Sequence, residues 1–333
     1  MPKFAIVGAG FAGLSVCWHL LQAYEAGDCE VTLFDPQGVG GGASSISTGL
    51  LHPFPGRLAL RSWLAQEGME ASEQLLQVAE NELQRPVALR NGVLRIALEP
   101  AQKKAFAKRA IEDAGAIWVA NVQDLVPLAI DAPGLWIPSG ITVFSKLYLK
   151  GLWSACARKG AVLDCTKIDR LAQLDAYDGV ILCAGSEILH FPECGHFPLE
   201  PLKGQTLLCR WDMDLANNLT QSLIGLGHIT PTEDPELCQI GSTYERGFSD
   251  AAPTPEAVRE LLDKVGSFYP PALEFEVMSQ AAGVRMNVRN GYRPIVEQIA
   301  PKAWVFTGLG SRGLLYHAEL GKRLSLTLRD LCK

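Results

Sequence analysis

Runs of apolar residues alternate with helical patterns at the start of the chain. The run Phe4–Val7 is short and wholly apolar, which predicts a buried strand, and a helix is expected from Leu14 to about Ala26. A second apolar run, Glu30–Phe34, predicts the next strand. Strand, helix and strand in this order indicate a βαβ unit with a parallel sheet.

The pattern changes twice further along the chain. Between residues 58 and 200 helical and strand patterns still alternate, whereas residues 204–244 hold three short strand patterns with no helix between them, which predicts an antiparallel sheet. The remaining expected helices span residues 58–83, 100–114, 147–157, 255–268 and 317–331, and the remaining expected strands span 92–97, 161–163, 177–183, 275–278 and 303–307.

The order of these elements predicts an α/β fold: a Rossmann-like nucleotide-binding domain with an inserted α+β domain built on an antiparallel sheet. The boundaries place residues 1–85, 140–200 and 285–333 in the first domain, and residues 86–139 and 201–284 in the second, which would receive the substrate. A chain of 333 residues with 48% hydrophobic and 20% charged residues can bury cores of this size.

Cysteine usage and charge limit the class of protein. The nine cysteines form no C-x-x-C pair, which favours reduced thiols in a cytoplasmic protein over disulfides or a metal site. The net charge of −6 argues against broad affinity for nucleic acid. No apolar stretch approaches the roughly 18 residues of a membrane span. We therefore expect a soluble cytoplasmic protein without a metal.

Three glycines follow the first strand with the spacing G-x-G-x-x-G. Gly8 permits a tight turn, Gly10 lets a pyrophosphate approach the backbone, and Gly13 allows close packing of the helix. Asp35 ends the second strand, 22 positions after Gly13, where a carboxylate would bind a ribose. The set predicts a dinucleotide site.

Two other glycine-rich segments also point to a ligand. The loop from Gly38 to Gly49 is rich in small residues and hydroxyl groups, as where a backbone passes close to a ligand, although a flexible surface loop has the same composition. The segment Gly308–Leu314 joins the last strand to the last helix, so its backbone N–H groups can meet an anion or a polar ring edge.

These segments together resemble the D-amino-acid-oxidase-like (DAO) family of FAD enzymes. The segments Gly49–Pro53, Leu202–Gln205, Gly241–Tyr244 and especially Gly308–Leu314 resemble one branch of it. That branch, MnmC, is the C-terminal oxidoreductase half of the tRNA 5-methylaminomethyl-2-thiouridine biosynthesis bifunctional protein. The sequence departs from it in lacking the methyltransferase half and in having His52 where the branch usually carries a tyrosine.

The resemblance implies a non-covalent FAD, since Met286 and Asn287 stand nearest the position of the cysteine that links the flavin in some members. It implies a cofactor site made of the residues Gly8, Gly10, Phe11, Ala12, Gly13, Asp35, Ala43, Ser44, Ser45, Gly49, Leu50, Ile168, Ala184, Gly185, Gly310, Ser311, Arg312, Gly313 and Leu314.

The resemblance also implies that Arg285 grips a substrate carboxylate, as a planar guanidinium can do with two hydrogen bonds. His52, Tyr244 and Arg312 are expected to line the pocket; Arg289 and Arg293 are weaker candidates. In such enzymes a hydride passes from carbon to the flavin and the resulting imine hydrolyses, so no general base among the side chains is required.

The leading hypothesis is an FAD-dependent oxidase of the C–N bond of an N-substituted glycine or amino acid. Its substrate would be a small amine or the carboxymethylaminomethyl group of a tRNA uridine, and its acceptor dioxygen or another oxidant. Two alternatives remain: an oxidase of free glycine, sarcosine or D-amino acids, and a catalytically silent FAD-binding protein. A dehydrogenase that uses a nicotinamide cofactor is disfavoured, because the C-terminal turn Gly308–Leu314 resembles that of flavin enzymes.

Overall fold

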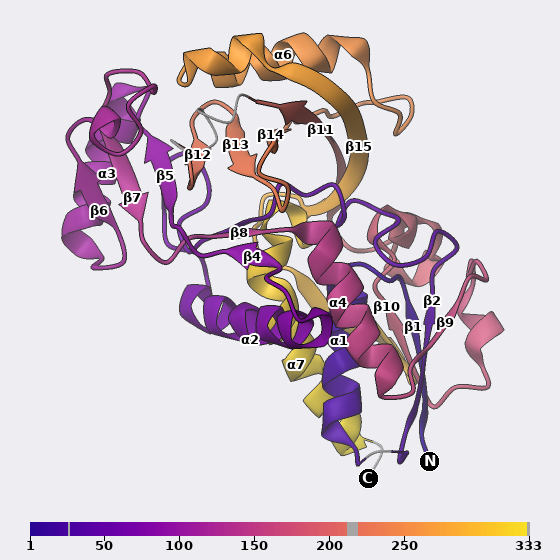
Figure 1. The fold of residues 1–333 in the computed structure, drawn as a ribbon. Coiled ribbons are helices and arrows are strands. Elements are labelled where there is room, and N and C mark those ends of the chain that lie inside the picture. Colours follow the sequence, from indigo (N-terminus) through magenta and orange to yellow (C-terminus); the bar gives the residue numbers. More distant parts are fainter. Residues whose placement is uncertain (26, 212–218, 332–333) are drawn as a thin grey trace.

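A computed structural model describes residues 1–25, 27–211 and 219–331 of the chain (Figure 1). A six-stranded sheet has the order β16-β17-β10-β1-β2-β9. Its members are β1 (Lys3–Val7), β2 (Glu30–Phe34), β9 (Val162–Asp164), β10 (Gly179–Leu182), β16 (Ile295–Ala300) and β17 (Ala303–Thr307). Only β16 runs antiparallel to its neighbour, so the predicted βαβ unit and parallel sheet are confirmed.

Helices cover one face of this sheet (Figure 1). They are α1 (Phe11–Ala23), α4 (Ser145–Arg158) and α7 (Gly313–Leu331), and α2 (Ala65–Leu83) packs on α4 and α7. Along β1, Phe4 and Ile6 point into the core with these helices, whereas Ala5 and Val7 belong to the core on the opposite face. The latter core includes the 3-10 segments η2 (Leu171–Leu174), η3 (Gly185–His190) and η4 (Pro192–Cys194).

A second sheet of eight strands has the order β15-β11-β14-β13-β12-β5-β7-β6. Its strands are β5 (Val93–Ile96), β6 (Ile117–Val119), β7 (Gly134–Ile137), β11 (Leu199–Arg210), β12 (Ser222–Ile224), β13 (His228–Pro231), β14 (Leu237–Gly241) and β15 (Glu276–Val288). All its pairings are antiparallel except that of β5 with β12, so the predicted antiparallel layer is confirmed.

Shorter elements complete the second layer. The helix α6 (Pro255–Gly266) and the turn η5 (Pro270–Glu274) cover one face of the eight-stranded sheet, while α3 (Pro100–Glu112) packs near β6 and β7 and η1 (Val122–Asp124) follows β6. A small sheet of β3 (Leu50–Leu51), β8 (Ile141–Val143) and β4 (Ala88–Leu89) joins the two layers. The turn η6 (Gly310–Arg312) precedes α7.

Three expected elements have different limits in the structure. The helix expected from residue 58 begins at Ala65, because Ala59 and Leu64 adopt positive φ angles of 50° and 49° that no α-helix accommodates. The first helix starts at Phe11 and ends at Ala23, and the last helix starts at Gly313 rather than His317. In the last case the glycine turn is itself the beginning of the helix.

The strand expected at residues 275–278 is only the beginning of β15. The strand continues for 13 residues to Val288, paired with β11 along its whole length. Ser279, Gln280 and Gly283 interrupt the apolar pattern, so the continuation has no local signal. The domain boundary expected at residue 285 falls inside this strand, and the division into domains stays a prediction.

Candidate active site

The glycines of the first turn are required by close backbone contacts. A Cβ atom on Gly13 would lie 1.8 Å from the carbonyl oxygen of Gly8. Gly8 itself has a φ of 107°, and a Cβ atom there would lie 2.3 Å from the carbonyl oxygen of Cys183 at the end of β10. Gly10 is the N-cap of α1 and has no side chain to cap the helix. Residue 10 therefore supplies no capping side chain to the N–H groups at the start of α1, the kind of groups that bind phosphates.

The small-residue loop before β3 closes over this turn. The hydroxyl of Ser44 accepts a hydrogen bond of 3.2 Å from the backbone N–H of Phe11, and it would lie 2.8 Å from a Cβ atom on Gly10. Ser45 donates to the carbonyl of Gly42 at 3.4 Å. At the other end of the loop, a Cβ atom on Gly49 would lie 1.8 Å from the carbonyl oxygen of Val143.

The same loop also touches the eight-stranded sheet. A Cβ atom on Gly283 of β15 would lie 2.8 Å from Cδ1 of Ile46 and 3.0 Å from Cα of Ala43. The side chain of Gln239 donates to the carbonyl of Ile46 at 3.1 Å. Leu50 begins β3 directly after the loop. The loop is therefore enclosed between the N-terminus of α1 and one face of the antiparallel sheet.

Asp35 lies at the end of β2, beside the turn. Its carboxylate accepts hydrogen bonds from the backbone N–H groups of Ala9 (2.9 Å) and Gln37 (3.0 Å). A carboxylate has about four acceptor positions, so capacity remains for the hydroxyls of a ribose.

The other expected adenosine-side residues lie at neighbouring positions. Ile168 is buried in one core with Val7 and Phe34, the final residues of β1 and β2. Ala184 and Gly185 follow the end of β10, which is the parallel neighbour of β1, and Gly185 has a φ of 55°. These residues therefore lie near the carboxyl ends of adjacent parallel strands, where ligands bind in open α/β sheets.

The C-terminal turn comes to the same place from the other side. Gly313 lies next to the Phe11 ring, which would be 3.4 Å from a Cβ atom on it. Gly310 has a φ of 53°, and a Cβ atom there would lie 2.4 Å from Oδ1 of Asn287 in β15. Leu314 is buried and Ser311 is exposed. The structure thus brings the two ends of the sequence together at the start of α1.

Arg285 and Tyr244 form a pair beside this turn. The guanidinium of Arg285 lies 4.9 Å from the centre of the Tyr244 ring and donates to the carbonyl of Thr243 at 3.3 Å. Its Nε atom is buried and makes no hydrogen bond within the described part of the chain. A Cβ atom on Gly204 of β11 would lie 2.6 Å from Nη2, so the glycine makes room for the guanidinium.

A half-buried histidine that the sequence did not suggest, His228, lies near Arg285. It opens β13, and its Nε2 atom forms a hydrogen bond of 2.7 Å with the hydroxyl of Thr48 in the loop before β3. Burial, followed by the positive charge of Arg285, lowers the pKa of His228 to about 3. The ring is therefore neutral at physiological pH.

His52 lies within electrostatic range of His228 and of the positive charges of Arg95 and Arg312. Burial lowers its pKa to about 3, with added effects of Arg95, His228 and Arg312, and its Nδ1 atom has no hydrogen-bond partner among the described residues. Arg95 is buried and donates to the carbonyls of Phe54 and Gly56, so it holds the segment after His52. The region is consequently both apolar and positive.

The sequence model of the family described as FAD dependent oxidoreductase (DAO) matches residues 3–325. The chain belongs to this family. FAD is therefore the cofactor of this enzyme. The N-terminal turn, the loop over it and the C-terminal turn are the segments that would surround it.

Solved structures with the same fold support the assignment. Glycine oxidase from Geobacillus kaustophilus superposes with a TM-score of 0.84 at 19% identity, covering 99% of this chain and 95% of that one. Iminodiacetate oxidase from Chelativorans sp. BNC1 gives 0.77 at 18%, covering 99% and 95%. L-proline dehydrogenase from P. horikoshii gives 0.80 at 17%, covering 97% and 92%. No curated protein matches the sequence.

The geometry of the chain fits FAD. Positions 8 and 13 exclude any side chain, position 10 accepts a Cβ atom only if the Ser44 side chain moves, and the N–H of Phe11 at the start of α1 faces the loop that carries Ser44. Backbone N–H groups at this turn would hold the pyrophosphate, and Asp35 would hold the ribose. The hydroxyl of Thr307, at the end of β17, is buried without a partner among the described residues.

A second histidine that the sequence did not suggest, His317, contacts the C-terminal turn. His317 of α7 places its Nδ1 atom 3.1 Å from the carbonyl of Leu314 and its Nε2 atom 2.6 Å from the hydroxyl of Tyr148. The carbonyl can only accept, so Nδ1 carries the proton and Tyr148 donates to Nε2. His228 and His317 lie among apolar residues of a strand and a helix, so no local sequence pattern distinguishes them. Only their hydrogen-bond partners in the fold show their part in this region.

Proposed function

We propose that this DAO-family enzyme oxidises the C–N bond of an N-substituted glycine. The observation that supports it is Arg285: a guanidinium with a buried, unpartnered Nε atom, held by Thr243 and Tyr244 and without an acidic partner in the described structure. A carboxylate is the anion whose two oxygens match such a fork. A glycine unit bound there would present its Cα–H bonds at a fixed distance from the guanidinium.

The reaction requires a neutral amine and a hydride acceptor. FAD, when bound, accepts the hydride from Cα. The chain holds Arg285, Arg95 and Arg312 around two neutral histidines, and this positive surrounding disfavours an ammonium group, so the bound amine loses its proton more readily than in water. Loss of hydride leaves an imine, and water then releases the amine and an oxo acid. No side-chain base is assigned.

A substrate carried on a tRNA uridine is the more specific form of this proposal, and the rim of the site favours it. Arg312 stacks on Tyr292 at 4.2 Å, and Arg293 stacks on Trp63 at 5.0 Å. The Tyr292 side chain is 75% exposed. Arginine planes and exposed rings are the groups on which unpaired bases stack.

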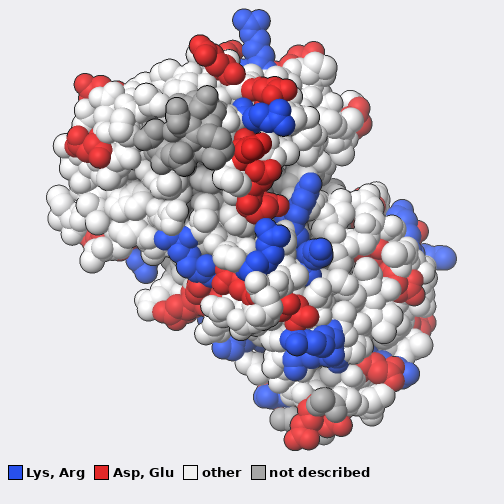
Figure 2. Space-filling view, viewed as in Figure 1, with Lys and Arg blue, Asp and Glu red and all other residues white. Residues whose placement is uncertain are grey.

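The charge distribution favours the competing candidate, a free amino acid. On the face seen in Figure 2, basic side chains gather in patches interspersed with acidic ones rather than in one continuous surface. With a net charge of −6, an extended RNA contact would depend on the rim alone. A free amino acid would need only Arg285 to bind its carboxylate.

The experiment is anaerobic mixing of the FAD-loaded enzyme with glycine, sarcosine, D-alanine and tRNA bearing 5-carboxymethylaminomethyluridine, with flavin bleaching as the signal. Faster reduction by sarcosine or the tRNA than by glycine and D-alanine supports an N-substituted glycine, and preference for the tRNA over sarcosine supports the more specific form. A flavin that none of them reduces would identify a catalytically silent FAD-binding protein.

A further inference from the structure

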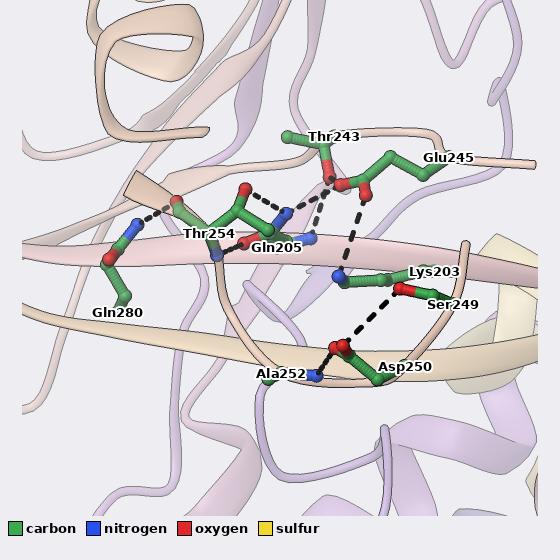
Figure 3. Close-up of polar contacts among 9 residues, drawn as sticks. All are labelled: Lys203, Gln205, Thr243, Glu245, Ser249, Asp250, Ala252, Thr254 and Gln280. Atoms are coloured by element: carbon green, nitrogen blue, oxygen red, sulfur yellow. Dashed lines mark hydrogen bonds and ion pairs between the residues drawn. The ribbon is translucent and has the colours of Figure 1, made fainter. Parts of the chain in front are cut away.

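The face of the antiparallel sheet opposite the site carries a polar network (Figure 3). Side chains alternate along β11, so Gly204 and Thr206 face the site, while Lys203 and Gln205 face the start of α6. The Gln205 side chain, 1% exposed, accepts from the backbone N–H of Thr254 at 2.7 Å and donates to the Thr254 hydroxyl at 3.1 Å. It thereby fixes the residue that precedes α6.

Glu245 is the centre of this network. Its Oε1 atom accepts from the Gln205 amide and from the Thr243 hydroxyl, both at 2.7 Å, and its Oε2 atom lies 3.7 Å from the ammonium of Lys203 (Figure 3). Burial acts to raise the pKa of the Glu245 carboxyl, but the donors Gln205 and Thr243 and the charge of Lys203 outweigh it, so the pKa is lowered. The group is an anion at neutral pH.

Lys203 depends on the Glu245 carboxylate to balance its charge. Its side chain is only 3% exposed, and Glu245 is its ion-pair partner in the described structure. The backbones of the two residues are also paired, with N–H to carbonyl distances of 3.1 and 2.9 Å. A buried ammonium without its anion is strongly unfavourable, so Lys203 and Glu245 stay together.

The network ends on the two groups that hold Arg285. The Thr243 hydroxyl binds Glu245 and also accepts from the backbone N–H of Gln205 at 3.0 Å. The carbonyl of the same threonine accepts from Arg285, and the next residue, Tyr244, stacks on that guanidinium. The Thr243–Tyr244 dipeptide is therefore held by contacts on one face of the sheet and contacts Arg285 on the other face.

We propose that Glu245 is a positioning residue for carboxylate recognition: it holds the Thr243–Tyr244 peptide, and this peptide orients the guanidinium of Arg285. The inference rests on the proposed function, in which Arg285 binds the substrate carboxylate. Tyr244 is 57% exposed and has little packing of its own to hold it, so its orientation depends on the neighbouring threonine.

The test compares Glu245→Gln with the wild-type holoenzyme. Sarcosine reduces the flavin under anaerobic conditions and gives a dissociation constant and a limiting rate; methoxyacetate, which has the carboxylate but no amine, gives a dissociation constant from the flavin absorbance. We expect Glu245→Gln to raise both dissociation constants roughly tenfold, with FAD content unchanged. The limiting rate should change less than twofold, because the chemistry of the bound substrate is the same.

Glu200→Gln is the matched control. Glu200 also lies on β11 and pairs with the adjacent loop residue, Arg246, at 3.2 Å, but it makes no contact with Thr243 in the described structure. It should leave both constants at the wild-type values. If Glu245→Gln is too unstable to purify, Thr243→Val removes the hydroxyl while keeping the Lys203–Glu245 ion pair, and it should weaken carboxylate binding in the same selective way.

The outcomes separate the two proposals. A wild-type enzyme that sarcosine reduces, combined with unchanged dissociation constants in Glu245→Gln or Thr243→Val, would overturn the positioning role alone. Equal losses in Glu200→Gln would overturn it as well, because a general disturbance of the loop would then explain the effect. A wild-type enzyme that binds neither ligand would overturn the proposed function, and the positioning role with it.

Discussion

The guanidinium of Arg285 lies 4.9 Å from the centre of the Tyr244 ring, although 41 positions separate the two residues in the sequence. Arg285 comes from β15 and Tyr244 from the segment after β14, and β11 pairs with both strands. The contact therefore depends on the order of strands in the antiparallel sheet.

Replacing Tyr244 should weaken substrate binding modestly. A cation–π contact at a partly exposed site contributes about 0.5–1 kcal/mol, so Tyr244→Leu should raise the sarcosine dissociation constant about two- to fivefold, while Tyr244→Phe should change it little. Anaerobic titration of the flavin measures both. Equal losses in the two variants would show that the hydroxyl, rather than the ring face, matters.

Removing the guanidinium should have a larger effect. We expect Arg285→Ala to raise the dissociation constant of sarcosine at least about tenfold while FAD stays bound, because a charge-assisted hydrogen bond contributes about 1.5–3 kcal/mol. Arg210→Ala is the control, since that arginine lies on β11 in an exposed ion pair with Glu276. Unchanged titrations of Arg285→Ala would contradict the assignment.

A methyl group at Gly204 should displace Arg285 without unfolding the protein. The new Cβ atom would lie 2.6 Å from Nη2, the end of a flexible side chain that can move. Gly204→Ala should therefore weaken carboxylate binding and leave the melting temperature within a few degrees of wild type. The comparison is with Gly195→Ala, where the nearest atom is 3.3 Å away. Normal substrate binding in Gly204→Ala would mean that the guanidinium is not confined there.

The carboxylate of Asp35 should contribute to FAD retention. Asp35→Ala removes the proposed ribose acceptor and the partner of the Ala9 N–H group, so we expect FAD to be lost on dialysis more readily than from wild type. Asp178→Ala removes a similar bond, to the N–H of Lys3, at the other end of β1. It should retain FAD. The ratio of flavin to protein absorbance after dialysis measures FAD retention in both variants.

Acid should destabilise the fold through His317. Burial lowers its pKa from 6.5 to about 4, so between these values the unfolded chain binds a proton that the folded chain does not. Stability should thus fall as the pH falls from about 6.5 towards 4, with His317 accounting for about 2 kcal/mol between pH 7 and 5. Denaturant unfolding of wild type and His317→Gln, with excess FAD, tests this; equal pH dependence in the two would contradict it.

Much of the cofactor region could be predicted because its signals are local. The strand, the glycine turn, the following helix and Asp35 lie within 35 residues, and each follows from periodicity or from steric limits on glycine. No helix in the described part of the structure is long and apolar enough to cross a membrane.

The substrate side was less predictable. Arg285 and Tyr244 were selected through family resemblance, while His228, Thr48 and Arg95 carry no local pattern. They are inward-facing residues on strands or loops whose neighbours come from distant parts of the chain. The extent of β15 was missed for the same reason, since its polar and glycine positions become regular only when paired with β11.

By itself, then, the sequence determined the strand, glycine turn and helix at the start of the chain, because the steric limits at residues 8 and 13 and the periodicity of the flanking elements act over a few residues. Only the tertiary structure decided which groups around Arg285 carry charge. Burial and nearby arginines make His52 and His228 neutral, and strand pairing sets Tyr244 on Arg285. Electrostatic effects depend on distance in space, which strand order fixes and sequence spacing does not.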